Sequence, residues 1–415
     1  NYVVSPHRVI SIGSTDAGNA FFFDSWTNRV GRLEQESDSI WTTGPGIGIA
    51  FPAVAVIHVQ RDSKSRILGL QWREGGTAVT ARRRLDNVAI PLSFKNGEVS
   101  LGGELLVPRS IGRHPAVVLL HGAGAESRRD FHWIRYYLAG KGIAVLSYDK
   151  RGVGESGGNW RTASFEDLAA DALAGVRLIR TRPDIDSLRI GVLGWSNGGW
   201  VAPLVTAHSE IAFAAVGAAP GTPSGENIAF EVEKDLQDAG LGKTEDNAGV
   251  AARQYVTRFV INHPAVTPTS WDSLKSVVAS ERGASWFSRA RIGWVLNVAP
   301  PPDSATISLL RGMRQQWTLD PVAGWSSVHV PVFIMLGAYD NAVPAPQSAE
   351  RLLSAFKRAG NCMATVKLYP GGSHALFRVN SLSQADVLAA THYVRGFPAD
   401  LTGWLQARTR RLSAC

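Results

Sequence analysis

The sequence predicts an α/β protein with a mostly parallel sheet covered by helices on both faces, preceded by a small β-rich domain. From about residue 88, apolar strand patterns alternate with amphipathic helical patterns, as in sheets that are buried on both sides. Residues 1–87 show short strand patterns separated by turns and no helical periodicity. We therefore expect a β-rich domain over residues 1–87 and an α/β domain over residues 88–415.

The bulk composition is that of an ordinary globular protein. The chain has 415 residues, of which 45% are hydrophobic and 19% charged, with a formal net charge of +8. No apolar run approaches the roughly 20 residues of a membrane span, so we expect no transmembrane segment. The arginine clusters at 82–84 and 408–411 lack interleaved aromatic residues, which favours surface charge over nucleic-acid binding.

The chain ends and the cysteines leave the compartment open. The chain begins at Asn1 without methionine, so a bacterial cytoplasmic location and export after removal of a leader are both compatible with it. Cys362 and Cys415 are too few for a disulfide framework and lack metal-ligand spacing. They either pair in an oxidising compartment or stay as two thiols. The oligomeric state is not predicted.

The elements are expected in the following order. In the N-terminal domain the clearest strands are 20–23, 54–59, 67–72 and 78–81. An Asn-Gly turn at 96–97 predicts a hairpin at the start of the α/β domain. Later strands are expected at 116–120, 143–148, 189–193, 211–216, 332–336 and 364–369. A helix is expected over 165–179, capped by Ser164 and Asp167, and a last helix near 400–410.

Residues 221–317 interrupt this alternation with helical patterns alone. An insertion at that point lies over the carboxyl edge of the sheet, where ligands bind in open α/β folds, so we expect a helical lid. Its tryptophans suit an apolar pocket, although they also suit the core of a helical subdomain. The candidate pocket residues are Trp195, Trp271, Trp286, Trp294 and Trp317.

Ser196 is the candidate nucleophile. It lies in Gly194-Trp195-Ser196-Asn197-Gly198, between a predicted strand and a predicted helix. A serine at such a turn has a strained backbone and an outward hydroxyl, and small residues two positions away let the turn close. Because a serine hydroxyl is a weak nucleophile near neutral pH, it needs a base.

His374 and Asp340 are the candidate base and acid. His374 lies in a glycine-rich loop after the strand at 364–369, and Asp340 lies just past the strand at 332–336. The order serine, aspartate, histidine is the one expected for this sheet topology. The backbone amides of Asn197 and Ala123 are the candidate donors to a tetrahedral oxyanion. We expect His121, beside Ala123, to fix the loop.

Together these segments resemble the α/β-hydrolase-fold serine hydrolases. The resemblance rests on the motifs at 121–124, 148–154 and 194–199 together with Asp340 and Ser373-His374. The segment Asp149-Lys150-Arg151-Gly152 is similar to that of bacterial carboxylesterases with a small β-rich N-terminal domain, and Arg151 is expected to brace its loop. Residues 375–395 form a longer segment before the last helix than is usual in this family.

The resemblance implies a serine carboxylesterase that forms an acyl-enzyme and requires no metal or organic cofactor. The tryptophan-rich insertion favours a hydrophobic small-molecule ester as the substrate. Two alternatives use the same residues: a peptidase or amidase, and an acyl-CoA thioesterase. A non-catalytic ligand-binding protein on the same scaffold is a further alternative.

Overall fold

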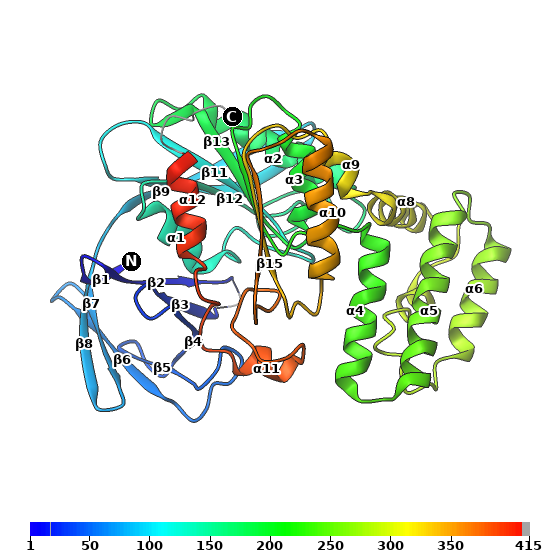
Figure 1. The fold of residues 1–415 in the computed structure, drawn as a ribbon, viewed down its shortest axis with the longest axis horizontal. Helices are drawn as coiled ribbons and strands as arrows, with labels where there is room; N and C mark the ends of the chain where they lie inside the picture. Colours follow the sequence, from blue (N-terminus) through cyan, green and yellow to red (C-terminus); the bar gives the residue numbers. More distant parts are fainter. Residues whose placement is uncertain (17, 409–415) are drawn as a thin grey trace.

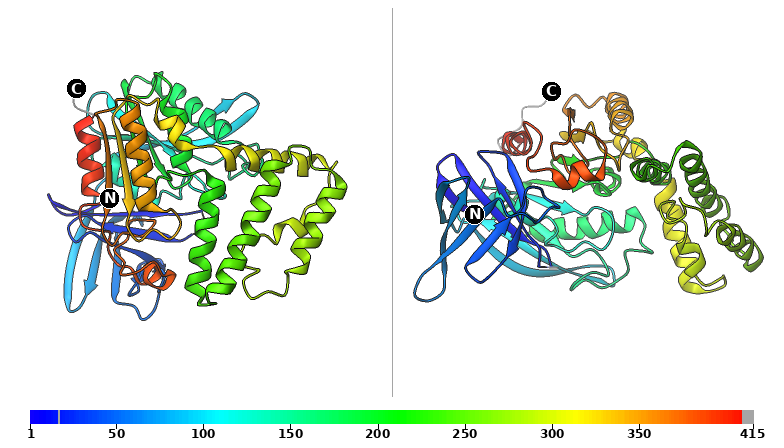
Figure 2. Two further views of the ribbon diagram at one scale, coloured as in Figure 1. Left: turned by 45° about the vertical axis from the view of Figure 1, so that its right-hand side comes forward. Right: turned by 90° about the horizontal axis from the view of Figure 1, so that it is seen from below.

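Two β-sheets and a group of helices make up the chain in the computed structural model, which describes residues 1–16 and 18–408. Figure 1 shows the N-terminal strands in blue beneath the second sheet, with the green and yellow helices to one side. The two turned views in Figure 2 keep these helices at the end opposite the blue strands. Among the described helices, none has the length and apolar character needed to span a membrane.

The first sheet is a closed antiparallel barrel. Its strands are β1 (Tyr2–Ser5), β2 (Arg8–Ser14), β3 (Ala20–Asp24), β4 (Arg29–Gln35), β5 (Ile40–Thr43), β6 (Ala55–Arg61), β7 (Ile67–Glu74) and β8 (Thr77–Arg83). Strand β1 closes the barrel by pairing with β8, with Tyr2 opposite Arg83. Closure leaves the sheet without a free edge. The predicted β-rich N-terminal domain is therefore confirmed, with β1, β2, β4 and β5 in addition to the expected strands.

The second sheet has eight strands in the order β16-β15-β14-β13-β11-β12-β10-β9. They are β9 (Asn87–Asn96), β10 (Val99–Pro108), β11 (His114–Leu120), β12 (Ala144–Tyr148), β13 (Ile185–Trp195), β14 (Ala214–Gly217), β15 (Val332–Gly337) and β16 (Ala364–Tyr369). The hairpin of β9 and β10 turns at Gly97, and β10 is antiparallel to both of its neighbours. All the other pairs are parallel, so their carboxyl ends lie at one edge.

Helices cover both faces of this sheet because its central strands are apolar on both sides. Helices α2 (Phe165–Arg180), α3 (Gly198–Thr206), α9 (Pro321–Trp325) and α10 (Ala345–Arg358) pack on the face that includes Val118. Helices α1 (His132–Ala139) and α12 (Ala399–Arg408) pack on the face that includes Val117. Helix α2 begins as expected, since Ser164 and Asp167 form a reciprocal cap.

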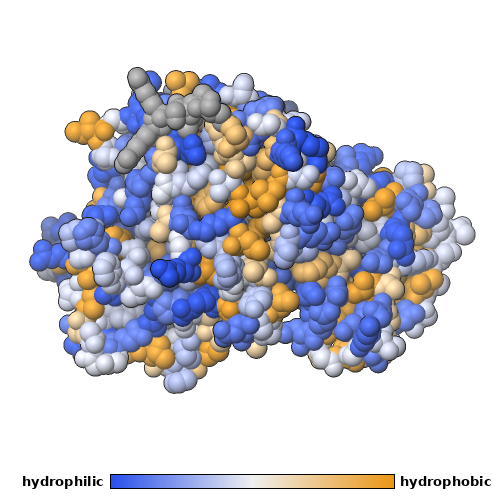
Figure 3. Space-filling model, viewed as in Figure 1, coloured by the Kyte–Doolittle hydropathy of each residue, from blue (hydrophilic) through white to orange (hydrophobic). Residues whose placement is uncertain are grey.

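A helical insertion separates β14 from β15. It contains α4 (Ser224–Ala239), α5 (Lys243–Asn262), α6 (Pro268–Ser280), α7 (Trp294–Asn297) and α8 (Ser304–Thr318). Residues 218–331, all of them described, form no strand. These helices share a hydrophobic core of their own, separate from the two cores of the sheet. In Figure 3 the insertion is a distinct lobe whose surface mixes polar and apolar residues.

The long segment after β16 runs along the barrel. It includes the short helix α11 (Gln384–Ala389), and its backbone bonds to β4 and to the loop between β5 and β6. Val30 N donates to Thr391 O over 2.9 Å, and Ile47 N donates to Ala390 O over 2.8 Å. The side chain of Asn28 donates to Tyr393 O and Val394 O, both over 3.0 Å. The length of residues 375–395 thus accommodates a connection to the barrel.

Phe23 of the barrel is buried against the second sheet's helices. It is 1% exposed, and its ring lies 4.4 Å from Trp133 and 5.8 Å from Tyr393 between centroids. We expect Phe23→Ala to lower the free energy of unfolding by about 3–5 kcal/mol, because it leaves a cavity in this shared core. Phe51→Ala is the matched control, since Phe51 is 67% exposed, and should change it by less than about 0.5 kcal/mol. Urea denaturation measures both values, and equal losses would contradict the shared core.

Candidate active site

Ser196 lies at a tight turn between β13 and α3. Its φ is 52°, in the left-handed region, and its N–H donates to Gly217 O over 3.0 Å. The turn also needs small neighbours, because a Cβ at position 198 would lie 2.9 Å from Leu120 O. A Cβ at position 194 would lie 3.1 Å from the carbonyl oxygen of residue 198. The local sequence therefore forces Ser196 out of the regular backbone, as is typical of a nucleophile turn.

Asp340 and His374 are in direct contact at the ends of adjacent strands. Asp340 follows β15 and His374 follows β16; Nδ1 of His374 lies 2.9 Å from Oδ1 and 3.0 Å from Oδ2 of Asp340. Asp340 as a whole is only 2% exposed, and its Oδ1 also accepts the backbone N–H groups of Ala342 and Val343, each over 2.8 Å. These bonds fix the carboxylate and thereby the ring.

Ser196 and His374 line one cavity of about 400 Å³. Ala123, Trp195 and Phe377 also contribute to its walls. Trp195 donates from Nε1 to the carbonyl oxygen of His374 over 3.1 Å, so this tryptophan steadies the loop that carries the imidazole. Of the tryptophans singled out from the sequence, Trp195 is the one at this cavity.

Opposing effects set the protonation of His374. Burial lowers the pKa of its imidazole, but the charge of Asp340 and the hydrogen bond to it outweigh burial, so the net pKa lies above the usual value of 6.5. Burial and the positive charge of Lys150 lower the pKa of His121 to about 3. His121 is therefore neutral at physiological pH, and its Nε2 lies 2.6 Å from Tyr148 O. It holds the loop in place.

Lys150 and Glu126 organise the loop after β11, a role that the sequence did not reveal. Lys150 donates from Nζ to Gly122 O over 2.6 Å and to Gly124 O over 2.7 Å. Glu126 accepts the N–H of Gly122 over 2.6 Å. These bonds hold the residues on either side of Ala123. Ala123 itself borders the cavity of Ser196 and a second cavity that Asn197 also lines. Both residues lie among other charged residues in the sequence, so nothing local singled them out.

Arg151 braces the neighbouring loop against α2. Its Nε and Nη2 donate to the two carboxylate oxygens of Asp171, each over 2.7 Å. The side chain of Asp171 is 1% exposed, so this is a buried, two-pronged ion pair.

The tryptophans of the insertion divide into two groups. Trp294 and Trp317 line the second cavity, of about 570 Å³. Trp271 and Trp286 do not line it; they lie in the core of the insertion, 0% and 6% exposed. The sequence-based expectation of pocket contact is therefore wrong for these two. They fill the space between helices instead.

Comparison with known proteins relates part of this chain to known hydrolases. Residues 113–243 match the family described as serine aminopeptidase, S33. Over 193 residues the chain is 30% identical to esterase EstD of Thermotoga maritima, covering 44% of this chain and 45% of the esterase. The chain is related to the serine hydrolases of the α/β-hydrolase fold. The family match contains Ser196 and Ala123, whereas Asp340 and His374 lie beyond it.

Two further relatives are named for other activities. Prolyl endopeptidase FAP of Mus musculus is 27% identical over 138 residues, or 30% of this chain and 18% of the endopeptidase. Thiohydrolase aneE of Aspergillus aculeatus is 33% identical over 105 residues, or 25% of this chain and 32% of the thiohydrolase. The chain thus spans less than half the length of each of these relatives.

The contact between His374 and Asp340 can be tested by titration. In an NMR titration, the midpoint for His374 is expected above 6.5, the usual pKa of a histidine, because the Asp340 carboxylate stabilises the charged ring. Asp340→Asn removes that charge and leaves burial, so the midpoint should fall. His132 is an internal control. Burial lowers the pKa of its imidazole to about 4, and Asp340→Asn should leave that pKa unchanged. An unchanged midpoint in Asp340→Asn would contradict the assignment.

Proposed function

We propose that this chain is a serine carboxylic-ester hydrolase with Ser196 as nucleophile, His374 as base and Asp340 as the acid that orients the base. One observation carries the proposal: an imidazole held by a buried carboxylate lines the same cavity as a serine at a strained turn. The relationship to esterase EstD supports ester hydrolysis over other reactions of the family.

In the proposed reaction, Oγ of Ser196 attacks the ester carbonyl while His374 takes the hydroxyl proton. The amides of Ala123 and Asn197 donate to the oxyanion of the tetrahedral intermediate, and each such donor is worth about 3 kcal/mol in comparable enzymes. His374 then returns the proton to the departing alcohol, which leaves the acyl group on Ser196. A water molecule, activated in turn by His374, releases the acid. Asp340 keeps the ring in the required tautomer throughout.

The helical insertion serves as the lid in this proposal. It walls the cavity of about 570 Å³ that reaches Ala123 and Asn197, and it contributes the apolar surfaces of Trp294 and Trp317. A hydrophobic small-molecule ester fits such walls. We also propose that the β-rich domain, residues 1–87, and the α/β domain, residues 88–415, are the functional divisions of the chain.

Replacing the nucleophile tests the mechanism. Ser196→Ala is expected to lower kcat for p-nitrophenyl ester hydrolysis by at least about a thousandfold, because no covalent acyl-enzyme can form. Circular dichroism should show an unchanged fold. Ser209→Ala, a change at an exposed serine, is the matched control and should leave the rate unaltered. Labelling by a fluorophosphonate should disappear in Ser196→Ala alone; retained turnover or labelling would refute the assignment.

Hydrolysis of amides or thioesters is the second candidate, favoured by the match to a serine aminopeptidase family and by the thiohydrolase relative. The three reactions share every proposed catalytic residue, so only the substrate distinguishes them. With one acyl group presented as an alkyl ester, an anilide and a coenzyme A thioester, we expect the highest kcat/KM for the ester. A higher value for either of the others would reassign the enzyme.

A further inference from the structure

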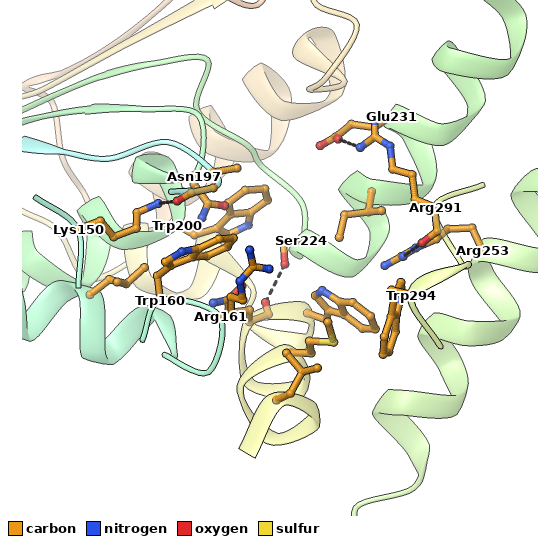
Figure 4. Close-up of a pocket in the computed structure, with 18 of the residues that line it drawn as sticks. Lys150, Trp160, Arg161, Asn197, Trp200, Ser224, Glu231, Arg253, Arg291 and Trp294 are labelled. Carbon is orange, nitrogen blue, oxygen red and sulfur yellow. Dashed lines mark hydrogen bonds and ion pairs between the residues drawn. The ribbon is translucent and has the colours of Figure 1, made fainter. Parts of the chain in front are cut away.

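The second cavity lies between the body of the protein and the helical insertion. Asn197 and Trp200 come from the start of α3, and Arg253 and Trp294 come from α5 and α7. Figure 4 shows the first pair and the second pair on opposite sides of the hollow, with Ser224 between them. A molecule bound here therefore extends from the proposed oxyanion donor, Asn197, toward the insertion.

Arg253 is a buried cation with unused donors. Its side chain lines this cavity, yet the residue is only 3% exposed. Nη1 donates to the carbonyl oxygen of Arg291 over 3.1 Å, and the guanidinium lies 4.8 Å from the ring centroid of Trp317. Within the described part of the chain, Nε and Nη2 have no hydrogen-bond partner. Buried donors without partners are costly, so an acceptor group on a bound molecule would be favourable at these two atoms.

The other charged residues of the cavity are already engaged or exposed. Arg291 donates to Glu231 and Asp235, each over 2.5 Å, so the carboxylate of Glu231 is already paired with Arg291. Lys150 is held by the carbonyl oxygens of the loop after β11. Arg161 is exposed and lies over Trp160. Four cations and one carboxylate therefore line the cavity, and its net charge favours an anion.

The unused edge of Arg253 has the geometry that binds carboxylates elsewhere in this chain. Arg151 presents Nε and Nη2 to Asp171, and Arg182 presents the same two atoms to Asp184 over 2.9 and 2.7 Å. The planar fork of a guanidinium edge matches the two oxygens of a carboxylate. Burial and the charge of Arg291 lower the pKa of Arg253 to about 10, so the group is still charged at neutral pH.

We propose that Arg253 binds a free carboxylate of the substrate, so that the preferred esters are monoesters of dicarboxylic acids. The connecting apolar chain lies along Trp200, Trp294 and Trp317, and the ester carbonyl reaches the turn at Ser196. This specificity rests on the proposed ester hydrolysis. Arg253 is a substrate-binding residue in it and takes no part in proton transfer.

Binding to a catalytically inactive protein tests the site separately from the reaction. In Ser196→Ala, calorimetry compares monomethyl esters with dimethyl esters of dicarboxylic acids, in a series from succinate to sebacate. We expect the monoester of fitting length to bind more tightly than its diester. Adding Arg253→Met should lower the affinity for the monoester about 10- to 100-fold, the range for a hydrogen bond to a charged group. The affinity for the diester should change less than about threefold.

Two variants serve as controls. Arg161→Met removes an exposed cation from the same cavity. It should lower the affinity for the monoester less than about threefold, because solvent screens that charge. Arg253→Lys keeps the charge without the fork and should give an intermediate loss. Thermal melts should show Arg253→Met to be as stable as the unchanged chain or more so, since the substitution removes an unpaired buried charge.

The outcomes separate the two proposals. No preference for the monoester at any length, or an equal loss in Arg161→Met and Arg253→Met, would overturn the carboxylate site. If Arg253→Met failed to fold, a monoester affinity unaltered in Arg253→Lys would overturn it as well. If neutral esters are hydrolysed but monoesters are neither preferred nor affected by Arg253→Met, the esterase proposal stands and the carboxylate site falls. Selective binding of monoesters without turnover of any ester would instead support the carboxylate site and refute the esterase.

Discussion

The contact between His374 and Asp340 is the interaction on which the proposed chemistry depends. A buried carboxylate is costly unless its oxygens are satisfied, and here the imidazole and two backbone N–H groups satisfy them. The sheet makes this contact possible because β15 and β16 are parallel neighbours whose carboxyl ends meet at one edge. Ser196 follows β13, which is separated from β15 only by β14. Three residues far apart in the sequence are thus brought to one edge by strand order.

The two cavities divide the surroundings of Ser196 into distinct environments. Ser196 and His374 line one, Asn197 and Arg253 line the other, and Ala123 borders both. The first combines aromatic side chains with the carboxyl groups of Glu126 and Asp130, whereas the second combines tryptophans with cations. An ester has two parts on either side of its carbonyl, so two unlike chambers allow each part to be selected separately.

Much of the sheet was predictable because its strands are apolar on both faces. The runs at 116–120 and 332–336 fall within β11 and β15, and the helical spacing at 165–179 falls within α2. Strand β4, Arg-Val-Gly-Arg-Leu-Glu-Gln, was missed because its charged residues hide the pattern. Candidate residues at strand ends could likewise be named from their position in the sequence.

The properties of the second cavity could not be predicted in this way. Trp271 and Trp294 both lie on helices of the insertion, and only helix packing decides that one is core and the other cavity wall. The unused donors of Arg253 depend on Glu231 and Asp235 being taken by Arg291, an arrangement across separate helices. Such contacts have no local sequence signature.

The junction between the barrel and the segment after β16 has a consequence for cooperativity. Phe23 shares a core with Trp133 and Tyr393, and the carbonyl oxygens of Leu388, Ala390 and Thr391 accept backbone hydrogen bonds from the barrel domain. Opening the barrel would therefore expose aromatic surface and free carbonyl groups on the segment that follows His374. Because each part satisfies the other's buried groups, we expect the two sheets to unfold together in a single transition.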